Sequence, residues 1–211
     1  MENNISKNDA DIIELVKRLQ SIADIGLLYS VNDYDKERYA EIKEISLRFW
    51  QKLSGVEINS IKELLLDTKE YPTAKVDIRG ILIEDRRILL VREMNDGRWS
   101  LPGGWADIGY SPKEVMIKEF KEETGIDIIP ERLLAIFDKK KHPHPPQPFY
   151  VYKLVFHCKS LSSDIKKGFD MLDVQFFDID HLPELSENRI LKSQIQLLYK
   201  SIVEGSPVYI D

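Results

Sequence analysis

GGWADIGYSPKEVMIKEFKEETGI, residues 103–126, is the stretch of this sequence that decides the fold. It predicts a glycine turn followed by one helix. Ser111 supplies an N-cap, Pro112 a preset φ at the first helical position, and Glu114 the glutamate of a capping box. Gly125 supplies the residue that ends the helix. We therefore expect one helix between these two signals.

Three glutamates of this helix are expected to share one face. At about 100° per residue, Glu119, Glu122 and Glu123 fall within one sector. A separate apolar sector for the core consists of Met116, Ile117 and Phe120. Carboxylates at this spacing repel one another by a few tenths of a kcal/mol per pair, so a bound cation is the natural compensation. Oxygen ligands select magnesium or manganese.

A solvated acidic helix face is the alternative interpretation, because most runs of glutamate are of that kind. The turn at Gly103 and Gly104, the cap and the stop signal all coincide with the glutamates, and this coincidence favours a metal site. Lys118 borders the same sector and is placed to hold one glutamate by an ion pair.

The stretch resembles the Nudix box, the pattern Gly, five residues, Glu, seven residues, Arg-Glu-apolar-any-Glu-Glu-any-Gly-apolar. The positions that match the box are Gly104, Glu119, Phe120, Glu122, Glu123, Gly125 and Ile126. Two positions depart from it. Tyr110 replaces the first glutamate, and Lys118 replaces the arginine. Lysine keeps the charge but lacks the bidentate fork of arginine, and tyrosine is no carboxylate ligand, so the number of bound ions stays open.

The resemblance implies a metal-dependent hydrolase that splits a diphosphate. In such an enzyme Glu119, Glu122 and Glu123 hold divalent ions, and Glu122 also counts as a catalytic residue. A backbone carbonyl of the turn, at Gly103, is a further expected ligand. Magnesium is the expected ion, and manganese is the alternative.

The box does not supply the general base, which in relatives is often an acid outside the helix. Asp170 and Asp173 are the two candidates, because they come just before an expected strand at residues 174–177. Ordinary loop carboxylates are an equally good interpretation of both residues.

Three residues are candidates for binding the substrate. Trp99 and Trp105 flank the glycine turn, where an aromatic ring can stack on a base, although a structural wedge beneath the turn is an equal alternative. Lys139 opens a run of lysines before a proline-rich loop, from which it could clamp a phosphate. A solvated loop lysine is the more common case.

Composition and charge limit the class of protein. The 211 residues are 43% hydrophobic and 31% charged, enough for one full core and a small second one. The net charge of -6 argues against nucleic acid as the main partner. The chain shows no secretion signal and no long apolar run, so we expect no membrane span and a cytoplasmic location. The single cysteine, Cys158, is expected to be a buried, inert thiol.

The chain is expected to divide near Tyr71 and Pro72, where the periodicity changes from helical to alternating. The first domain, residues 1–70, is helical and carries no catalytic constellation. The second domain, residues 71–211, contains the glutamate helix.

The helical domain has apolar residues at intervals of three and four, which predict two helices and a third short one after Ser60. Asn32-Asp33 marks the first break and Ser54-Gly55 the second. The aromatic residues of this domain favour a subunit interface over a base-stacking platform, because so small a domain rarely buries its own core. These residues are Tyr29, Tyr34, Tyr39, Phe49 and Trp50.

The second domain alternates between strand and helix patterns. We expect a hairpin over residues 76–90, further strands at residues 149–156 and 174–177, and a closing helix at residues 188–204. This order predicts an α/β fold with a mixed sheet between helices. The resemblance implies the same architecture, a Nudix α/β/α sandwich preceded by a small all-helical N-terminal domain.

A helical domain before this fold, together with Tyr110, resembles the subgroup described as hydrolases of X-linked nucleoside diphosphates, most closely its CDP-choline pyrophosphatase. The resemblance implies hydrolysis of CDP-choline to CMP and phosphocholine by a homodimer joined partly through the N-terminal helices. ADP-ribose or another nucleoside diphosphate would use the same metal site, and an RNA-processing activity is a further alternative. A nucleotide sensor without hydrolysis is the rival class, which Tyr110 and Lys118 favour and the three glutamates oppose.

Overall fold

The structure is a computed structural model that describes residues 7–55, 57, 59–60, 71–162 and 164–211. The chain forms two compact units. The helical unit comprises Met1–Ala74 and Pro146–Tyr150, and the α/β unit comprises Lys75–Pro145 and Val151–Asp211. The short helix expected after Ser60 lies outside the described residues.

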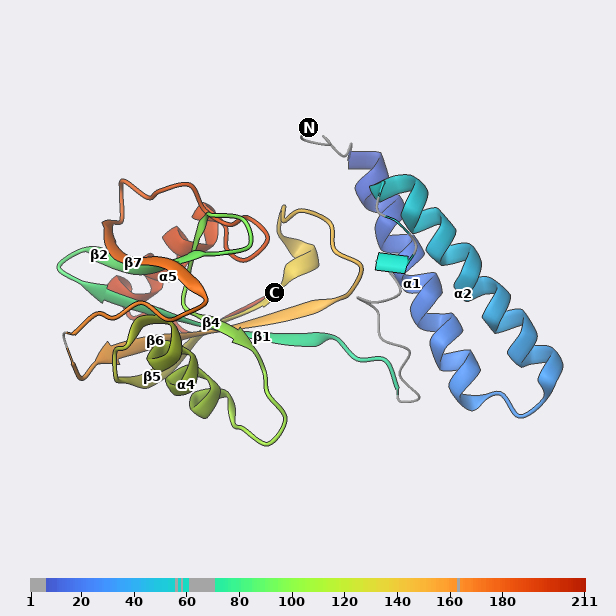
Figure 1. The fold of residues 1–211 in the computed structure, drawn as a ribbon, viewed down its shortest axis with the longest axis horizontal. Coiled ribbons are helices and arrows are strands. Elements are labelled where there is room, and N and C mark those ends of the chain that lie inside the picture. The colour runs from blue at the N-terminus through green and yellow to red at the C-terminus, as the bar shows by residue number, and fades with distance from the viewer. Residues whose placement is uncertain (1–6, 56, 58, 61–70, 163) are drawn as a thin grey trace. The chain divides into compact units, whose positions relative to one another are not determined.

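The helical unit contains a hairpin of two helices, α1 (Lys7–Tyr29) and α2 (Asp33–Ser54) (Figure 1). Asn32 is the N-cap of α2, and its side chain accepts a hydrogen bond from the Asp35 backbone N–H at 2.8 Å. Gly55 ends α2 with a left-handed φ of 70°. Both breaks expected from the sequence are therefore confirmed.

Helix α1 carries two apolar stripes. Ile13 and Val16 are buried against Leu47 and Trp50 of α2, and these four residues form the core of the hairpin. The second stripe remains exposed and consists of Ile12, Leu15, Leu19 and Ile22. Among the described helices, none combines the length and the apolar character needed to cross a membrane.

The α/β unit is built on one mixed sheet. Its strands are β1 (Lys75–Glu84), β2 (Arg87–Glu93), β3 (Trp99–Ser100), β4 (Gly103–Trp105), β5 (Ile128–Asp138), β6 (Val151–Ser160), β7 (Met171–Asp178) and β8 (Tyr209–Ile210). The order is β3-β2-β1-β6-β5-β8, with β4 also paired to β1 and β7 to β2. Strand β1 is parallel to β6 and β5 is parallel to β8, whereas the other pairs are antiparallel.

Two helices cover opposite faces of this sheet (Figure 1). Helix α4 (Pro112–Thr124) packs on the face that carries Ile78 and Leu82, and α5 (Lys192–Glu204) packs on the face that carries Ile81. The expected sandwich with a mixed sheet is therefore confirmed.

Glycine allows α4 to approach the sheet closely. A Cβ on Gly80 of β1 would lie 2.4 Å from Phe120 Cε2 and 2.8 Å from Met116 Sδ, and both of these side chains are buried in α4. Cys158 of β6 is buried in the same core, where burial raises the pKa of its thiol. The close approach holds α4 against the strand that pairs with the glycine turn.

Several boundaries differ from those expected. Strand β7 begins at Met171, so Asp173 lies inside it rather than before it. Helix α5 begins only at Lys192, because the preceding residues form a turn in which the Arg189 N–H donates to the Ser186 carbonyl. Strand β5 was not expected, since two irregularities in its pairing with β6 break the alternation of apolar residues.

The turn at the end of α4 generates a stability prediction. Gly125 and Gly205 both end helices with a left-handed φ, of 74° and 66°. A Cβ on Gly125 would lie within 3.1 Å of Lys166 Cβ, O and N, whereas nothing lies within 4 Å of a Cβ on Gly205. Gly205→Ala should cost about 1 kcal/mol of backbone strain, and Gly125→Ala about 1–3 kcal/mol more.

Denaturant unfolding of the two variants measures this difference. Equal losses in the free energy of unfolding would show that the segment around Lys166 does not pack on the end of α4.

Candidate metal and catalytic site

The ends of α4 fix where its glutamates lie. The Ser111 Oγ accepts a hydrogen bond from the Glu114 N–H, and the Glu114 Oε2 accepts one from the Ser111 N–H at 2.7 Å, so the capping box is formed. At the other end the Gly125 N–H donates to the Lys121 carbonyl. The helix predicted from these signals is confirmed, with Pro112 as its first residue.

The glycine turn faces the last turns of α4. Strand β4 pairs with β1 so that Gly103 lies opposite Arg79 and Gly104 opposite Ile78. Gly103 has a φ of 133°, and a Cβ there would lie 2.1 Å from the Ile78 carbonyl oxygen. A Cβ on Gly104 would lie 2.7 Å from Glu119 Oε1. Both positions therefore require glycine, the first for its backbone and the second to make room for a carboxylate.

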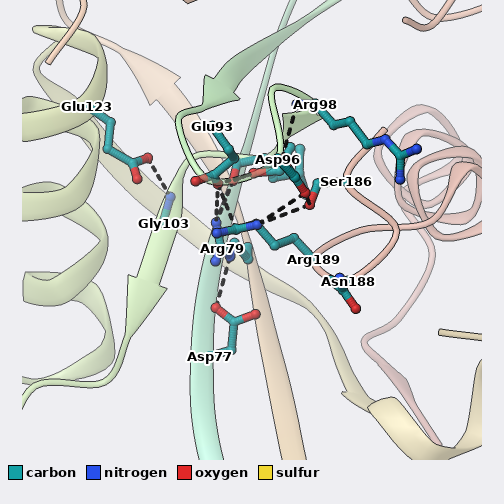
Figure 2. A network of polar contacts seen from close by, with 12 residues as sticks. Asp77, Arg79, Glu93, Asp96, Arg98, Gly103, Glu123, Ser186, Asn188 and Arg189 are labelled. Atoms are coloured by element: carbon teal, nitrogen blue, oxygen red, sulfur yellow. Dashed lines mark hydrogen bonds and ion pairs between the residues drawn. The ribbon is translucent and has the colours of Figure 1, made fainter. Parts of the chain in front are cut away.

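The three glutamates have different surroundings. Glu123 is 5% exposed, and its Oε2 accepts a hydrogen bond from the Gly103 N–H at 2.9 Å (Figure 2). Glu119 is half-buried against Gly104, and Glu122 is exposed. In the part of the chain that the structure describes, no three His, Cys, Asp or Glu side chains converge closely enough to hold an ion. The three glutamates expected on one face of the helix therefore range from buried, at Glu123, to exposed, at Glu122.

Burial dominates the electrostatics of two of these carboxyls. It raises the pKa of Glu123 to about 8, against the opposing influences of the Arg79 charge and the Gly103 N–H. Burial also raises the pKa of Glu119, again against the Arg79 charge. The charge of Glu119 adds to the rise at Glu123, and that of Glu122 adds to the rise at Glu119. The three groups therefore interact, although they do not touch a common point.

The donor chemistry of these residues suits a divalent cation, although among the described residues no three carboxyls converge on one point. They offer hard oxygen donors, two of them partly or fully desolvated, whose mutual repulsion a cation would relieve. The space that a side chain at position 104 would fill is taken by the Glu119 carboxylate. A solvated acidic face does not explain a carboxyl buried as deeply as that of Glu123.

The sequence suggests an ion pair between Lys118 and one of the glutamates, but in the structure Lys118 pairs with Asp107 instead. Its Nζ lies 2.7 Å from Asp107 Oδ2 and 5.6 Å from the centre of the Tyr110 ring. Asp107 belongs to the loop between β4 and α4, and this loop brings a carboxylate within reach of the exposed flank of the helix. The cation of the box position is therefore paired with a carboxylate of this loop.

The two candidate bases have different environments. Asp170 is exposed and follows Gly168, whose N–H donates to the Glu123 carbonyl at 2.9 Å. A Cβ on Gly168 would lie 2.3 Å from the Glu122 carbonyl oxygen and 3.1 Å from Asp170 Oδ1. Asp170 thus lies on a segment that packs on the end of α4.

Asp173 is paired with Arg92 in the sheet. Its carboxylate accepts hydrogen bonds from the Val174 N–H at 2.8 Å and from Gln175 Nε2 at 2.6 Å. Local hydrogen bonds of the strand therefore already occupy both of its oxygens.

The three candidate substrate residues are also separated. Trp99 has structural contacts: its backbone N–H donates to the Glu184 carbonyl, and its ring packs edge-on against Phe177, with 4.6 Å between the ring centres. Trp105 is 48% exposed directly after the glycine turn, with Lys75 Nζ 5.5 Å from its ring centre. Of the two tryptophans, Trp105 is exposed and Trp99 is partly buried.

Lys139 is not a solvated loop residue. It begins the short 3-10 helix η1 (Lys139–Lys141), is buried, and donates from Nζ to the Asn188 carbonyl at 2.6 Å. Its ammonium group therefore anchors the turn before α5.

The sequence interpretation missed a buried ionic network beside the turn (Figure 2). Arg79 Nε lies 2.9 Å from Asp77 Oδ1, and Arg79 Nη1 lies 3.8 Å from Glu93 Oε1. Lys153 Nζ also contacts Asp77, and Arg189 Nε lies 2.9 Å from Glu93 Oε1. One signal was available, because charged residues at positions 77 and 79 interrupt an otherwise apolar strand.

The pKa of Glu123 predicts that raising the pH destabilises the metal-free protein. The folded protein holds this proton up to a pH of about 8, whereas the unfolded carboxyl releases it near 4.5. Between these values the folded state binds more protons, so the free energy of unfolding falls as the pH rises.

Glu123→Gln should remove this part of the decline, as measured by denaturant unfolding in chelator across that pH range. Glu114→Gln, on the same helix but exposed, is the control and should retain it. Parallel curves for wild type and Glu123→Gln would contradict the assignment.

Comparisons with known proteins identify the family of both domains. The NUDIX domain model matches residues 73–198, and the model described as the UDP-X-like N-terminal oligomerisation domain matches residues 10–65. The putative ADP-ribose pyrophosphatase YjhB of Bacillus subtilis is 42% identical over 187 residues, which cover 89% of this chain and 90% of that protein.

Two solved structures are also similar. A UDP-X diphosphatase is 36% identical, has a TM-score of 0.63, and matches over 96% of this chain and 99% of its own. An ADP-ribose pyrophosphatase from Streptococcus suis is 37% identical, has a TM-score of 0.59, and matches over 66% of this chain and 100% of its own. With the matched domain spanning more than half of its length, the chain belongs to the Nudix family.

Proposed function

We propose that this pyrophosphohydrolase splits the diphosphate linkage of a nucleoside diphosphate joined to a second group, and releases a nucleoside monophosphate. The observation that carries the proposal is the pairing of Glu123 and Glu119 with the glycine turn. The likeness to a UDP-X diphosphatase over nearly the whole chain supports the substrate class.

The proposed reaction needs a divalent ion, and we assign Mg²⁺, with Mn²⁺ as a substitute. Glu119, Glu122 and Glu123 would hold it, with the Gly103 carbonyl as a further ligand. When bound, the ion neutralises phosphoryl charge and lowers the pKa of an attacking water. The chain itself contributes placement, because the capped helix and the turn fix Glu119 and Glu123, while Glu122 faces solvent from which substrate enters.

Asp170 is the general base that we favour. It is exposed on a segment that packs on the end of α4, whereas both oxygens of Asp173 accept hydrogen bonds within β7. Asp170→Asn should therefore lower turnover, and Asp173→Asn should change it little. The reverse result would transfer the role to Asp173.

Three substrates are candidates, and they differ in the nucleoside and in the group joined to its diphosphate. Two relatives have names that specify ADP-ribose, and one structure is that of a UDP-X diphosphatase. The resemblance of the helical domain and Tyr110 to CDP-choline pyrophosphatase adds CDP-choline, with CMP and phosphocholine as products. Trp105 is the residue placed to stack on a base, because it is exposed beside the turn.

A nucleotide sensor without hydrolysis is the second candidate function. Lys118 supports it, since this residue replaces the arginine of the box and binds Asp107 instead of a glutamate. The depth at which Glu123 is buried opposes it, because a binding site for nucleotide alone has no need of a desolvated carboxyl.

A substrate panel tests the enzyme. CDP-choline, ADP-ribose and UDP-linked sugars are incubated with Mg²⁺ or Mn²⁺, and chromatography should detect a nucleoside monophosphate from at least one. Glu122→Gln should lower turnover by roughly two orders of magnitude or more, because an amide holds the ion poorly. Glu114→Gln is the control on the same helix. Tight nucleotide binding without any product would identify a sensor.

We also propose that the helical unit joins two copies of the chain. The matched N-terminal model describes an oligomerisation domain, and α1 leaves the stripe that contains Leu15 and Leu19 exposed beside a filled hairpin core. A second copy would remove this stripe from water.

Leu15→Lys tests the dimer, since it places a charge in the centre of the stripe. Leu15 is 65% exposed, and Val203 of α5 is 67% exposed in the α/β unit, so Val203→Lys is the matched control. Light scattering should detect monomers for Leu15→Lys and dimers for Val203→Lys. A dimer that survives Leu15→Lys would contradict this use of the stripe.

A further inference from the structure

Arg79 occupies an unusual position beside the glycine turn. It is 7% exposed on β1, and three groups surround its guanidinium. The Nε group donates to Asp77 Oδ1 at 2.9 Å and Nη1 donates to the Leu101 carbonyl at 3.0 Å, while Glu93 lies 3.8 Å from Nη1. The planar guanidinium of arginine can donate to two such partners at once in a fixed geometry, which the single ammonium group of lysine cannot reproduce.

Two contacts connect Arg79 to the turn that holds Glu123. The backbone of Arg79 is paired with Gly103, the residue whose N–H donates to Glu123. The side chain of Arg79 donates a hydrogen bond to the carbonyl of Leu101, which is two residues before Gly103. Figure 2 shows Gly103 between Arg79 and Glu123. Arg79 thus contacts the 101–103 segment twice, through its backbone at Gly103 and through its side chain at Leu101.

Other cations of the neighbourhood are engaged elsewhere. Lys153 contacts Asp77, Arg189 lies 2.9 Å from Glu93, and Lys118 binds Asp107 outside the turn. Arg79 is thus the cation in this network whose side chain and backbone both contact the 101–103 segment.

We propose that Arg79 is the positioning residue of the metal site: its guanidinium fixes the 101–103 segment and so sets the Glu123 carboxylate where a divalent ion binds. The inference rests on the proposed function, because it presupposes that Glu123 is a ligand. Lys118, at the arginine position of the box, does not position a glutamate in this structure, because it pairs with Asp107.

Arg79→Lys separates positioning from charge. Lysine keeps the positive charge but cannot hold Asp77 and the Leu101 carbonyl with one planar group. Arg132 supplies a matched control, since its guanidinium also binds backbone carbonyls, those of Ser201 at 2.8 Å and Ser206 at 3.0 Å, away from the glutamates. Arg132→Lys therefore reports the general cost of losing such a fork.

The readouts are Mn²⁺ affinity, by electron paramagnetic resonance of the nucleotide-free protein, and the separate values of kcat and KM. For Arg79→Lys we expect about 10–100-fold weaker Mn²⁺ binding and a lower kcat, with KM nearly unchanged. Arg132→Lys should resemble wild type in all three. Equal Mn²⁺ affinity for Arg79→Lys and Arg132→Lys would overturn the inference.

Two outcomes need separate interpretation. If wild type itself neither binds Mn²⁺ nor hydrolyses nucleotides, the proposed function fails rather than the role of Arg79. If Arg79→Lys does not fold, as judged by circular dichroism, Asp77→Asn replaces it, because it removes the charged partner of Arg79 Nε. This variant should weaken Mn²⁺ binding in the same direction, and unchanged binding would overturn the inference.

Discussion

The buried carboxyl of Glu123 is the constraint on which the arrangement of this domain depends. Removing a carboxylate from water costs several kcal/mol unless hydrogen bonds and opposite charges compensate. Here the Gly103 N–H and the charge of Arg79 offset this cost only in part, because burial still raises the pKa of Glu123 to about 8. Each requires exact local structure, because the turn exists only with glycine and Arg79 is held by Asp77.

Strand β1 links the hydrophobic core to the ionic network. One of its faces carries Ile78 and Gly80 and receives α4, so that the helix lies close to the sheet. The other face carries Asp77 and Arg79, whose charges lie beside the glycine turn. The face with Ile78 and Gly80 thus sets the distance of the glutamate helix, and the charges of Asp77 and Arg79 on the other face act on the glycine turn that the helix meets.

Local signals made the glutamate helix predictable, because Ser111 and Gly125 act on the residues next to them. The hairpin from β1 to β2 and the mixed sheet followed from alternation. The unequal burial of the glutamates did not follow from the sequence, since it depends on the pairing of the glycine turn with β1. The same holds for Lys118, whose partner Asp107 belongs to a loop, and for Lys139, which is buried by the segment before α5.

The central claim is that these glutamates and the glycine turn form one divalent-ion site. The most direct measurement is an anomalous-scattering map from crystals grown with Mn²⁺ and a non-hydrolysable nucleoside diphosphate. We predict a manganese peak in coordination contact with carboxylate oxygens of Glu119, Glu122 and Glu123. A peak elsewhere, with Glu123 still bound to the Gly103 N–H and Glu122 in solvent, would contradict the account.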